Sequence, residues 1–331
     1  MNETSFPITR RRLFKQTFLY SAALALGAKA RTVTAAEVPK ADQHFMMLGD
    51  WGWGHASDPA QGAVAQGMQS YVKQTKIKPQ GIFMLGDNFY GGFKGGVKSP
   101  RWKAEFEDAY PKEVFPGPCW AVLGNHDYDE EPITKLQAQL DYAKSNPGTR
   151  WTMPSKWYRF EYPLIKPLVT VLALDSNYRN RLISLTPEEK AAQLAWLKSE
   201  LAKPKVAPWT IVIGHHPIYS NGIHGDTAEL VKEWDTLFRK HKIPFYFCGH
   251  DHDMQHLELQ DHPTSFVLSG GGGAKLYPVK PNARGPYAES VYGFTHLQIS
   301  EERIITRHLD PNAKQLHGFS KNLAGKIELL S

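Results

Sequence analysis

Residues 82–90 read Ile82-Phe83-Met84-Leu85-Gly86-Asp87-Asn88-Phe89-Tyr90, an apolar run that ends in a glycine followed by polar side chains. A short, nearly continuous apolar run predicts a strand that is covered on both faces of its sheet. Glycine lets the backbone turn sharply after the strand, so the next side chain reaches the sheet edge. The same order recurs at four other places, which are Gly49-Asp50-Trp51-Gly52, Gly124-Asn125-His126-Asp127, Gly214-His215-His216 and Gly249-His250-Asp251-His252.

The apolar runs predict six strands with helical segments between them. The strands are expected at residues 45–48, 82–85, 120–123, 168–174, 209–213 and 245–248. The clearest helix is predicted over 186–201, where Thr186 is the N-cap, Pro187 lies in the first turn and Glu189 completes a capping box. Strands that alternate with helices indicate an α/β fold. Ligands of such folds bind beyond the carboxyl ends of the strands, which is where all five motifs fall.

The five motifs together offer two carboxylates, a phenol, an amide and at least three imidazoles, which is more than one metal ion can use. Carboxylate, imidazole and amide oxygen suit iron, zinc and manganese, and no motif contains a thiol. The motifs therefore do not favour zinc-finger or iron–sulfur chemistry. The pattern predicts a two-metal hydrolase.

One set of eight side chains carries a specific resemblance, namely Asp50, Asp87, Tyr90, Asn125, His126, His215, His250 and His252. These residues resemble the purple acid phosphatases of the calcineurin-like metallophosphoesterase superfamily, and the small mammalian-type (tartrate-resistant) members are the most similar. The likeness runs from about His44 to about Gly273. It implies an αββα four-layer sandwich of two mixed sheets, both of which supply ligands.

Tyr90 is the residue that makes this resemblance specific. A phenol has a pKa near 10, so it becomes a ligand in acid only if a strong Lewis acid displaces its proton. Tyr90 therefore indicates Fe(III), unless it only packs as an aromatic at the sheet edge. The resemblance implies a ferric site made of Asp50, Tyr90, His252 and bridging Asp87. It implies a site for divalent Fe, Zn or Mn made of Asn125, His215, His250 and Asp87.

The activity implied by the resemblance is acid phosphatase activity, in which a metal-bound hydroxide attacks a phosphate monoester. His126 and His224 are expected to bind the substrate or to act as general acids, with a solvated loop histidine as the alternative for His224. The alternatives are a phosphodiesterase or nucleotide hydrolase of the same superfamily and, with less support, a non-enzymatic phosphate or metal binder. Small phosphorylated molecules are the expected substrates.

Other polar residues near the motifs have two interpretations each. Three carboxylates adjacent to ligand positions either orient imidazoles or are exposed acids, namely Asp127, Asp251 and Asp253. The run 269–273 is either a tight turn or an anion nest. His216 is expected outside the metal shell, and Asp175 is expected to be structural. Cys119 and Cys248 are expected to be buried free thiols, with a disulfide as the alternative.

The amino terminus predicts export. Arg10-Arg11-Arg12 followed by an apolar stretch from about residue 18 to 28 resembles a bacterial twin-arginine signal, with a basic membrane anchor as the alternative. Residues 1–36 are therefore expected to be removed by the Tat export route, leaving one catalytic domain over 37–331 that is periplasmic or secreted and monomeric. Residues 1–36 contain six Lys or Arg and one acid, so their removal lowers the formal net charge from +6 to +1. Neither a nucleic-acid partner nor stable membrane insertion is expected of the mature chain.

Overall fold

β1 (Gln43–Leu48) and β2 (Pro79–Met84) pair in parallel, so the first two motif-bearing strands end at the same edge of one sheet. The structure is a computed structural model that describes residues 42–53, 59–129, 132–178, 185–280 and 284–330. Residues 41–331 form one compact unit. The predicted signal at residues 1–36 lies outside the described residues.

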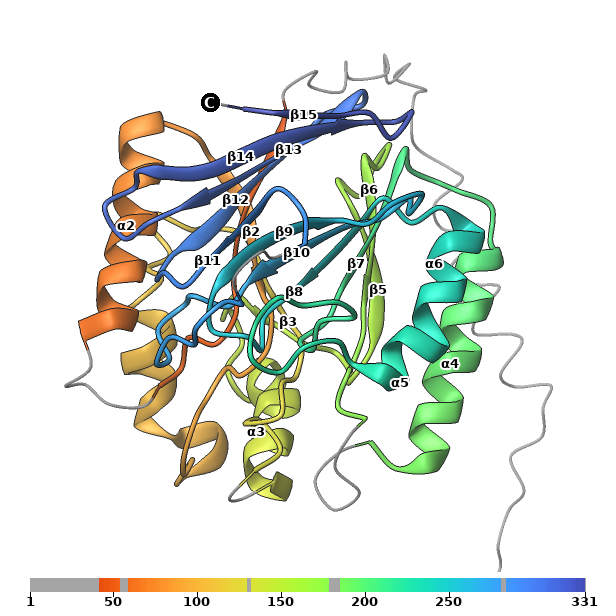
Figure 1. The fold of residues 1–331 in the computed structure, drawn as a ribbon. Coiled ribbons are helices and arrows are strands. Elements are labelled where there is room, and N and C mark those ends of the chain that lie inside the picture. The colour runs from red at the N-terminus through yellow and green to blue at the C-terminus, as the bar shows by residue number, and fades with distance from the viewer. Residues whose placement is uncertain (1–41, 54–58, 130–131, 179–184, 281–283, 331) are drawn as a thin grey trace, which may run out of the picture. The chain divides into compact units, whose positions relative to one another are not determined.

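The first sheet has eight strands within the described residues, in the order β15-β14-β13-β12-β1-β2-β3-β4 (Figure 1). Its central strands β1 to β4 run parallel, whereas β12 to β15 form an antiparallel extension on the other side of β1. The remaining bounds are β3 (Cys119–Ala121), β4 (Trp151–Thr152), β12 (Phe294–Ile299), β13 (Arg303–Leu309), β14 (Gln315–Asn322) and β15 (Ile327–Leu329).

The second sheet has seven strands in the described part of the chain, in the order β11-β9-β10-β8-β7-β6-β5. Strands β6, β7, β8 and β10 run parallel, and the antiparallel strands β5, β9 and β11 complete the sheet. The bounds are β5 (Tyr158–Tyr162), β6 (Val169–Ala173), β7 (Trp209–Ile213), β8 (Phe245–Cys248), β9 (Met254–Glu258), β10 (Ser265–Ser269) and β11 (Tyr287–Glu289). Both sheets are therefore mixed, as the resemblance implied.

Helices lie on the outer side of each sheet. Figure 1 shows α2 outside the eight-stranded sheet and α4 with α6 outside the seven-stranded one. The helices are α2 (Pro59–Thr75), α3 (Pro132–Ser145), α4 (Pro187–Ala202), α5 (Ala228–Leu230) and α6 (Thr236–His241), with a 3-10 turn at Gly96–Lys98 and π-helical turns at Trp102–Glu107 and Val231–Asp235. The predicted capping box begins α4, because Thr186 and Glu189 each accept a hydrogen bond from the other's backbone amide.

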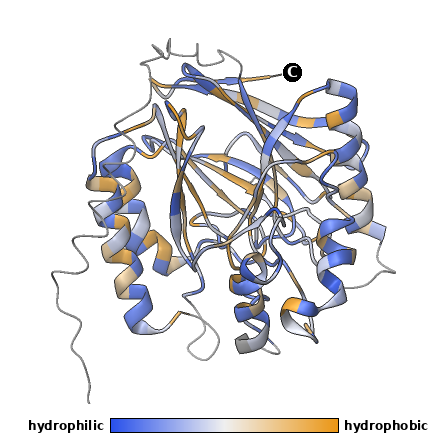
Figure 2. Ribbon diagram, turned by 180° about the vertical axis from the view of Figure 1, so that it is seen from behind, coloured by the Kyte–Doolittle hydropathy of each residue, from blue (hydrophilic) through white to orange (hydrophobic). Residues whose placement is uncertain are grey.

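Alternation along β7 shows how the layers are held together. Ile211 and Ile213 belong to the apolar core that includes residues of β1 and β2, whereas Val212 belongs to the core shared with Leu197 of α4. Successive strand residues point to opposite faces, so β7 has one face against the other sheet and one against helices. Figure 2 shows apolar residues concentrated in the strands between outer helices with mixed surfaces. The four-layer αββα sandwich is confirmed.

Both cysteines are buried free thiols, as expected, and they lie in different sheets: Cys119 opens β3 and Cys248 ends β8. Burial raises the pKa of the Cys119 thiol to about 12 and that of Cys248 well above its usual value, so neither thiol is reactive. Within the described part of the chain, the helices lack the length and apolar character that crossing a bilayer requires.

Candidate metal centre

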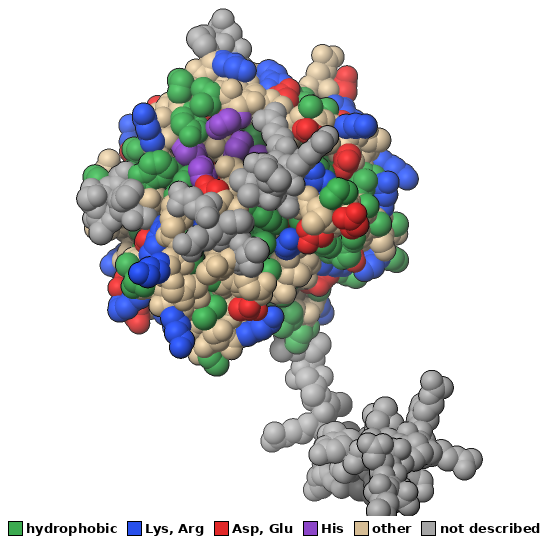
Figure 3. Space-filling view, turned by 90° about the horizontal axis from the view of Figure 1, so that it is seen from below, with side chains coloured by type: hydrophobic (Ala, Val, Ile, Leu, Met, Phe, Trp, Pro, Cys, Tyr) green, Lys and Arg blue, Asp and Glu red, His purple; other side chains and the backbone are tan. Residues whose placement is uncertain are grey.

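The carboxyl ends of the parallel strands of both sheets meet at one edge, and the five motifs follow these ends. The motifs after β1, β2 and β3 contribute Asp50, Asp87, Tyr90 and Asn125, and those after β7 and β8 contribute His215, His250 and His252. Seen from this side, histidine side chains gather in one place on the surface (Figure 3). Side chains that lie up to 202 positions apart in sequence, from Asp50 to His252, therefore form one site.

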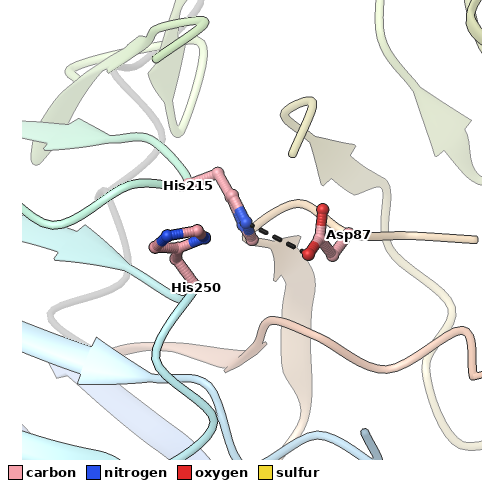
Figure 4. A group of neighbouring side chains, drawn as sticks. All are labelled: Asp87, His215 and His250. Carbon is pink, nitrogen blue, oxygen red and sulfur yellow. Dashed lines mark ion pairs between the residues drawn. The ribbon is translucent and has the colours of Figure 1, made fainter. Parts of the chain in front are cut away.

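A first group of donor atoms surrounds Asn125. Its Oδ1 lies 2.9 Å from His250 Nδ1 and 3.2 Å from His215 Nε2. His215 Nε2 also lies 3.3 Å from Asp87 Oδ2 (Figure 4). Asp87, His215 and His250 each offer a ligand atom within 4.8 Å of the others. The structure thus brings together the four residues expected at the divalent site.

A second group surrounds the Tyr90 hydroxyl. This oxygen lies 3.2 Å from Asp50 Oδ1 and 3.0 Å from His252 Nε2, and the tyrosine side chain is buried. Asp50, Asp87 and His252 again offer ligand atoms within 4.8 Å of one another. Asp87 is common to both groups. The four residues expected at the ferric site are therefore also neighbours.

Three of these residues have a left-handed backbone, with φ of 60° at Asp50, 47° at Asp87 and 73° at His250. Such conformations are rare outside glycine and collect at functional sites. The ligand residues themselves, and not only the glycines before them, therefore make the turns. At Gly124 and Gly249 the requirement is space, because a Cβ there would lie 2.2 Å from Asp87 Oδ1 and 2.3 Å from Asp50 Oδ2.

The two histidines nearest the carboxylates are oriented by backbone carbonyl groups. His215 Nδ1 donates to Leu85 O at 2.9 Å, and His252 Nδ1 donates to Lys275 O at 2.7 Å. A hydrogen bond of this kind fixes the tautomer and leaves Nε2 as the donor atom for a metal. In both rings Nε2 points into the carboxylate group.

Without a cation, burial and neighbouring charges raise the pKa of three of these groups and lower that of Asp87, His250 and His252. Burial raises the pKa of Asp50 well above its usual range, and burial with Asp87 and Asp50 raises that of Tyr90. Burial alone would lower the pKa of His215, but Asp87 and Asp50 raise it to about 9. Burial acts to raise the pKa of Asp87, but the charge and hydrogen bond of His215 lower the pKa of Asp87 on balance.

These residues fit a pair of metal ions. Asp50 and Asp87 are fully buried carboxylates, and the groups beside them are imidazoles and a phenol that are themselves metal donors. Buried charges of one sign are stable only when a cation compensates them. Oxygen and nitrogen donors without thiolate match iron, zinc and manganese.

The two expected general acids lie beside this centre. The His126 ring lies over the Tyr90 ring at 4.4 Å between centroids, and the His224 ring lies 4.3 Å from that of His250. Burial acts to lower the pKa of His126, but Asp129 and Asp87 raise it on balance. His224 Nδ1 donates to Asp251 Oδ1 at 2.7 Å. Each histidine thus has a carboxylate partner.

The three carboxylates with two interpretations are all buried, so the interpretation as exposed acids is wrong. Asp127 accepts hydrogen bonds from the amides of Gly124, Asn88 and Phe89, which fixes two of the motif loops together. Asp251 holds His224 rather than one of the expected metal ligands. Asp253 accepts from the side chain of Gln255.

Other expectations for neighbouring residues are met. His216 Nδ1 forms a hydrogen bond of 2.9 Å with Ser176 Oγ, and His216 lies outside both groups of expected metal ligands. Asp175 is buried and accepts from Tyr128 at 2.5 Å, a structural contact. The run 269–273 is a tight passage, since a Cβ at Gly270 would lie 2.0 Å from Asp251 O.

Sequence reasoning missed several residues that shape the site. Tyr277 stacks on His252 at 4.2 Å, and Arg101 donates to Tyr90 O at 2.6 Å. Asp129 contacts His126, and Lys135 of α3 donates to Asp129, from a segment that carries no recognisable motif. An isolated lysine in an amphipathic helix has no sequence signal that separates it from a surface residue.

Comparison with known proteins agrees with this geometry. Residues 44–254 match the family described as calcineurin-like phosphoesterase. Tartrate-resistant acid phosphatase type 5 of Sus scrofa is 31% identical over 318 residues, which cover 88% of this chain and 89% of the relative. The enzyme of the same name from Oryctolagus cuniculus is 32% identical over 296 residues, which cover 82% of this chain and 88% of the relative.

Solved structures support the fold. GAP50, described as the anchor in the inner membrane complex of Plasmodium, superposes with a TM-score of 0.70 at 26% identity, covering 85% of this chain and 89% of its own. Purple acid phosphatase PPD1 from yellow lupin superposes with a TM-score of 0.65 at 17% identity, covering 85% of this chain and 54% of its own. The chain therefore belongs to the calcineurin-like phosphoesterase family, within which its relatives are the purple, tartrate-resistant acid phosphatases.

Proposed function

We propose that this acid phosphatase hydrolyses phosphate monoesters at a centre of one ferric and one divalent ion, the latter Fe, Zn or Mn. Membership of the family makes the chain a hydrolase of small phosphorylated substrates with a dinuclear metal centre. The observation that carries the ferric assignment is the buried Tyr90 hydroxyl, 3.2 Å from Asp50 and 3.0 Å from His252. A phenol whose pKa is raised by burial needs a strongly acidic cation to bind as tyrosinate.

The side chains divide into two ligand sets in this proposal. Asp50, Tyr90 and His252 would hold the ferric ion, and Asp87 would be shared with the second ion. Asn125, His215 and His250 complete the divalent site. When bound, the two ions supply Lewis acidity and an acidified water as the nucleophile.

The protein's own part is to orient and to move protons. His215 and His252 are held by backbone carbonyls, so their Nε2 atoms stay directed at the ions without further ordering. His126 and His224 lie on the substrate side. A protonated imidazole there binds a phosphate oxygen and can deliver a proton to the leaving alkoxide.

The test of the ferric site compares Tyr90→Phe with Tyr277→Phe, a tyrosine that stacks on His252. The wild-type protein should purify with iron and a visible charge-transfer band, and Tyr277→Phe should keep both. Tyr90→Phe should lose the band. Absence of the band from the iron-reconstituted wild type would refute the assignment.

The leaving group separates the roles of the two histidines. His126→Gln and His224→Gln should lower turnover of an alkyl phosphate more than that of p-nitrophenyl phosphate, whose phenolate leaves without a proton. Equal losses on both substrates would exclude proton donation and leave substrate binding. Assays with a diester and a nucleotide test the alternative activities.

We also propose that residues 1–36 direct export of the folded chain by the twin-arginine route. The support is the run Arg10-Arg11-Arg12 before an apolar stretch. Replacing Arg11 and Arg12 by Lys should retain the protein inside the cell. Amino-terminal sequencing of exported protein shows whether the segment is removed.

A further inference from the structure

A chain of three charged side chains runs from α3 to the metal centre. Lys135 Nζ donates to Asp129 Oδ1 at 2.7 Å, and Asp129 Oδ2 accepts from His126 Nδ1. Lys135 is fully buried, and the Asp129 side chain is 23% exposed. The three residues thus form one connected network that ends on a ring beside the expected ligands.

The buried lysine also holds the ligand loop. Its Nζ donates to Gly91 O at 2.8 Å and to Phe89 O at 3.2 Å, the residues on either side of Tyr90. Gln139, one turn further along α3, donates to Asp127 Oδ1 at 3.0 Å. One face of α3 therefore fixes both the loop after β2 and the loop after β3.

A buried ion pair is a poor source of stability. Removing a lysine and a carboxylate from water costs several kcal/mol for each ion, and the attraction between them offsets this only in good geometry. Replacing both members of such a pair by apolar side chains is often neutral or stabilising, so stability alone does not account for the pair. The pair is better explained by the position that it imposes on its third member, His126.

His126 is held at two points on the centre. Its backbone amide donates to Asp87 Oδ1 at 2.7 Å, and its ring lies over the Tyr90 ring. Asp129 occupies Nδ1, so Nε2 is the nitrogen left to serve the substrate. Rotation of the ring about its bond to Cβ would break the contact with Asp129, which restricts where Nε2 can point.

We propose that Asp129, held in place by Lys135, is a positioning residue that directs His126 Nε2 at the leaving-group oxygen. This inference rests on the proposed role of His126 as proton donor. The carboxylate fixes the orientation of the ring through Nδ1, and the lysine fixes the carboxylate. Asp129 touches neither substrate nor metal and acts only through His126.

The experiment measures kcat and KM of Asp129→Asn on an alkyl phosphate and on p-nitrophenyl phosphate, with the metal-loaded enzyme. General acid catalysis accelerates such reactions roughly 10²- to 10⁴-fold. Misorientation of the acid should lower the rate by about tenfold. We expect kcat on the alkyl phosphate to fall about tenfold, while KM for the alkyl phosphate changes less than twofold. Turnover of p-nitrophenyl phosphate should also change less than twofold. Asp141→Asn, on an exposed part of α3 beside Lys144, is the matched control.

A double-mutant cycle with His126→Gln shows whether Asp129 acts through that ring. Asp129→Asn should have no further effect on alkyl phosphate turnover in the His126→Gln background. Additive losses would overturn the proposal. If His126→Gln lowers the turnover of both substrates equally, the proton-donor role of His126 fails. If His126→Gln affects mainly the alkyl phosphate but Asp129→Asn affects both substrates equally, only the positioning role of Asp129 fails.

Asp129→Asn leaves Lys135 without a carboxylate and can therefore lower stability. The second variant is Asp129→Glu, which keeps a carboxylate for Lys135 and leaves the bonds from Lys135 to Phe89 O and Gly91 O in place. Metal content and thermal unfolding of both variants show that the fold and centre are intact. Asp129→Glu should lose less alkyl phosphate turnover than Asp129→Asn, and full turnover of the alkyl phosphate by intact Asp129→Asn would overturn the inference.

Discussion

His308 of β13 makes the fold sensitive to acid, away from the metal centre. The ring is completely buried, accepts from Thr295 Oγ1 at 2.8 Å and donates from Nε2 to Gln255 O at 3.2 Å. Burial, together with the neighbouring His317, lowers the pKa of His308 to about 3. The neutral ring is therefore satisfied in the folded chain and stays neutral well below its ordinary titration range.

The sign of the effect follows from proton uptake. The unfolded chain binds a proton on this residue near pH 6.5, whereas the folded chain does not until about pH 3. The contribution to the free energy of unfolding is thus fully present above pH 6.5 and is lost as the pH falls. At about 1.36 kcal/mol per pH unit, the loss between pH 7 and pH 4.5 is about 2.5 kcal/mol.

His308→Gln isolates this contribution, because glutamine keeps a donor and an acceptor but does not titrate. Urea unfolding followed by tryptophan fluorescence at pH 7 and pH 4.5 gives the free energies for wild type and variant. Protonation of the metal ligands affects both proteins alike and cancels in the difference between them. The wild type should lose about 2.5 kcal/mol more than the variant over this pH interval.

The control is His241→Gln at the end of α6, which removes a histidine outside this buried group. The prediction is refuted if wild type and His308→Gln lose the same free energy of unfolding within about 0.5 kcal/mol, which is the accuracy of such differences. Equal losses would mean that the buried His308 ring accepts a proton in the folded chain without a free-energy penalty.

Three further outcomes are expected. Tyr128→Phe leaves the buried carboxylate of Asp175 without its hydroxyl donor and should lower the free energy of unfolding by about 1–3 kcal/mol in urea titrations; an unchanged midpoint would contradict this. Gly124→Ala places a Cβ 2.2 Å from a ligand carboxylate and should reduce metal content at least tenfold by elemental analysis after dialysis, whereas Gly62→Ala in α2, with open space around it, should not. Metal loading at pH 7 should release protons, because His215 has a pKa of about 9 in the metal-free site; calorimetry in buffers of different ionisation enthalpy measures this, and identical heats would refute it.

Six strands could be predicted because they are continuous apolar runs, namely β1, β2, β3, β6, β7 and β8. β7 and β8 were predicted at their observed bounds, and the helix over 186–201 differs from α4 by one residue at each end. Strands β4, β5 and β9 to β15 were not predicted. In β14, polar residues such as His317 and Ser320 interrupt the apolar pattern, although residues 318–321 are buried in the folded chain.

The site was predicted more completely than the fold, because its ligands follow strand ends within short motifs. All seven expected ligands lie together, although which ion each one holds stays a prediction. The contribution of α3 was not predictable. Lys135 looks like a surface lysine in sequence, and only the tertiary packing reveals that it is buried against the loop that carries Tyr90.

The direction of β1 determines how this enzyme can be attached to a surface. The described chain begins at Asp42, at the start of β1, and Asp50 follows the other end of that six-residue strand. At about 3.3 Å per residue, a linker joined directly before Asp42 would enter roughly 20 Å from Asp50, at the opposite end of β1. An enzyme immobilised through this end would present its phosphate-binding side to the solution, with access to bulky substrates unhindered by the support.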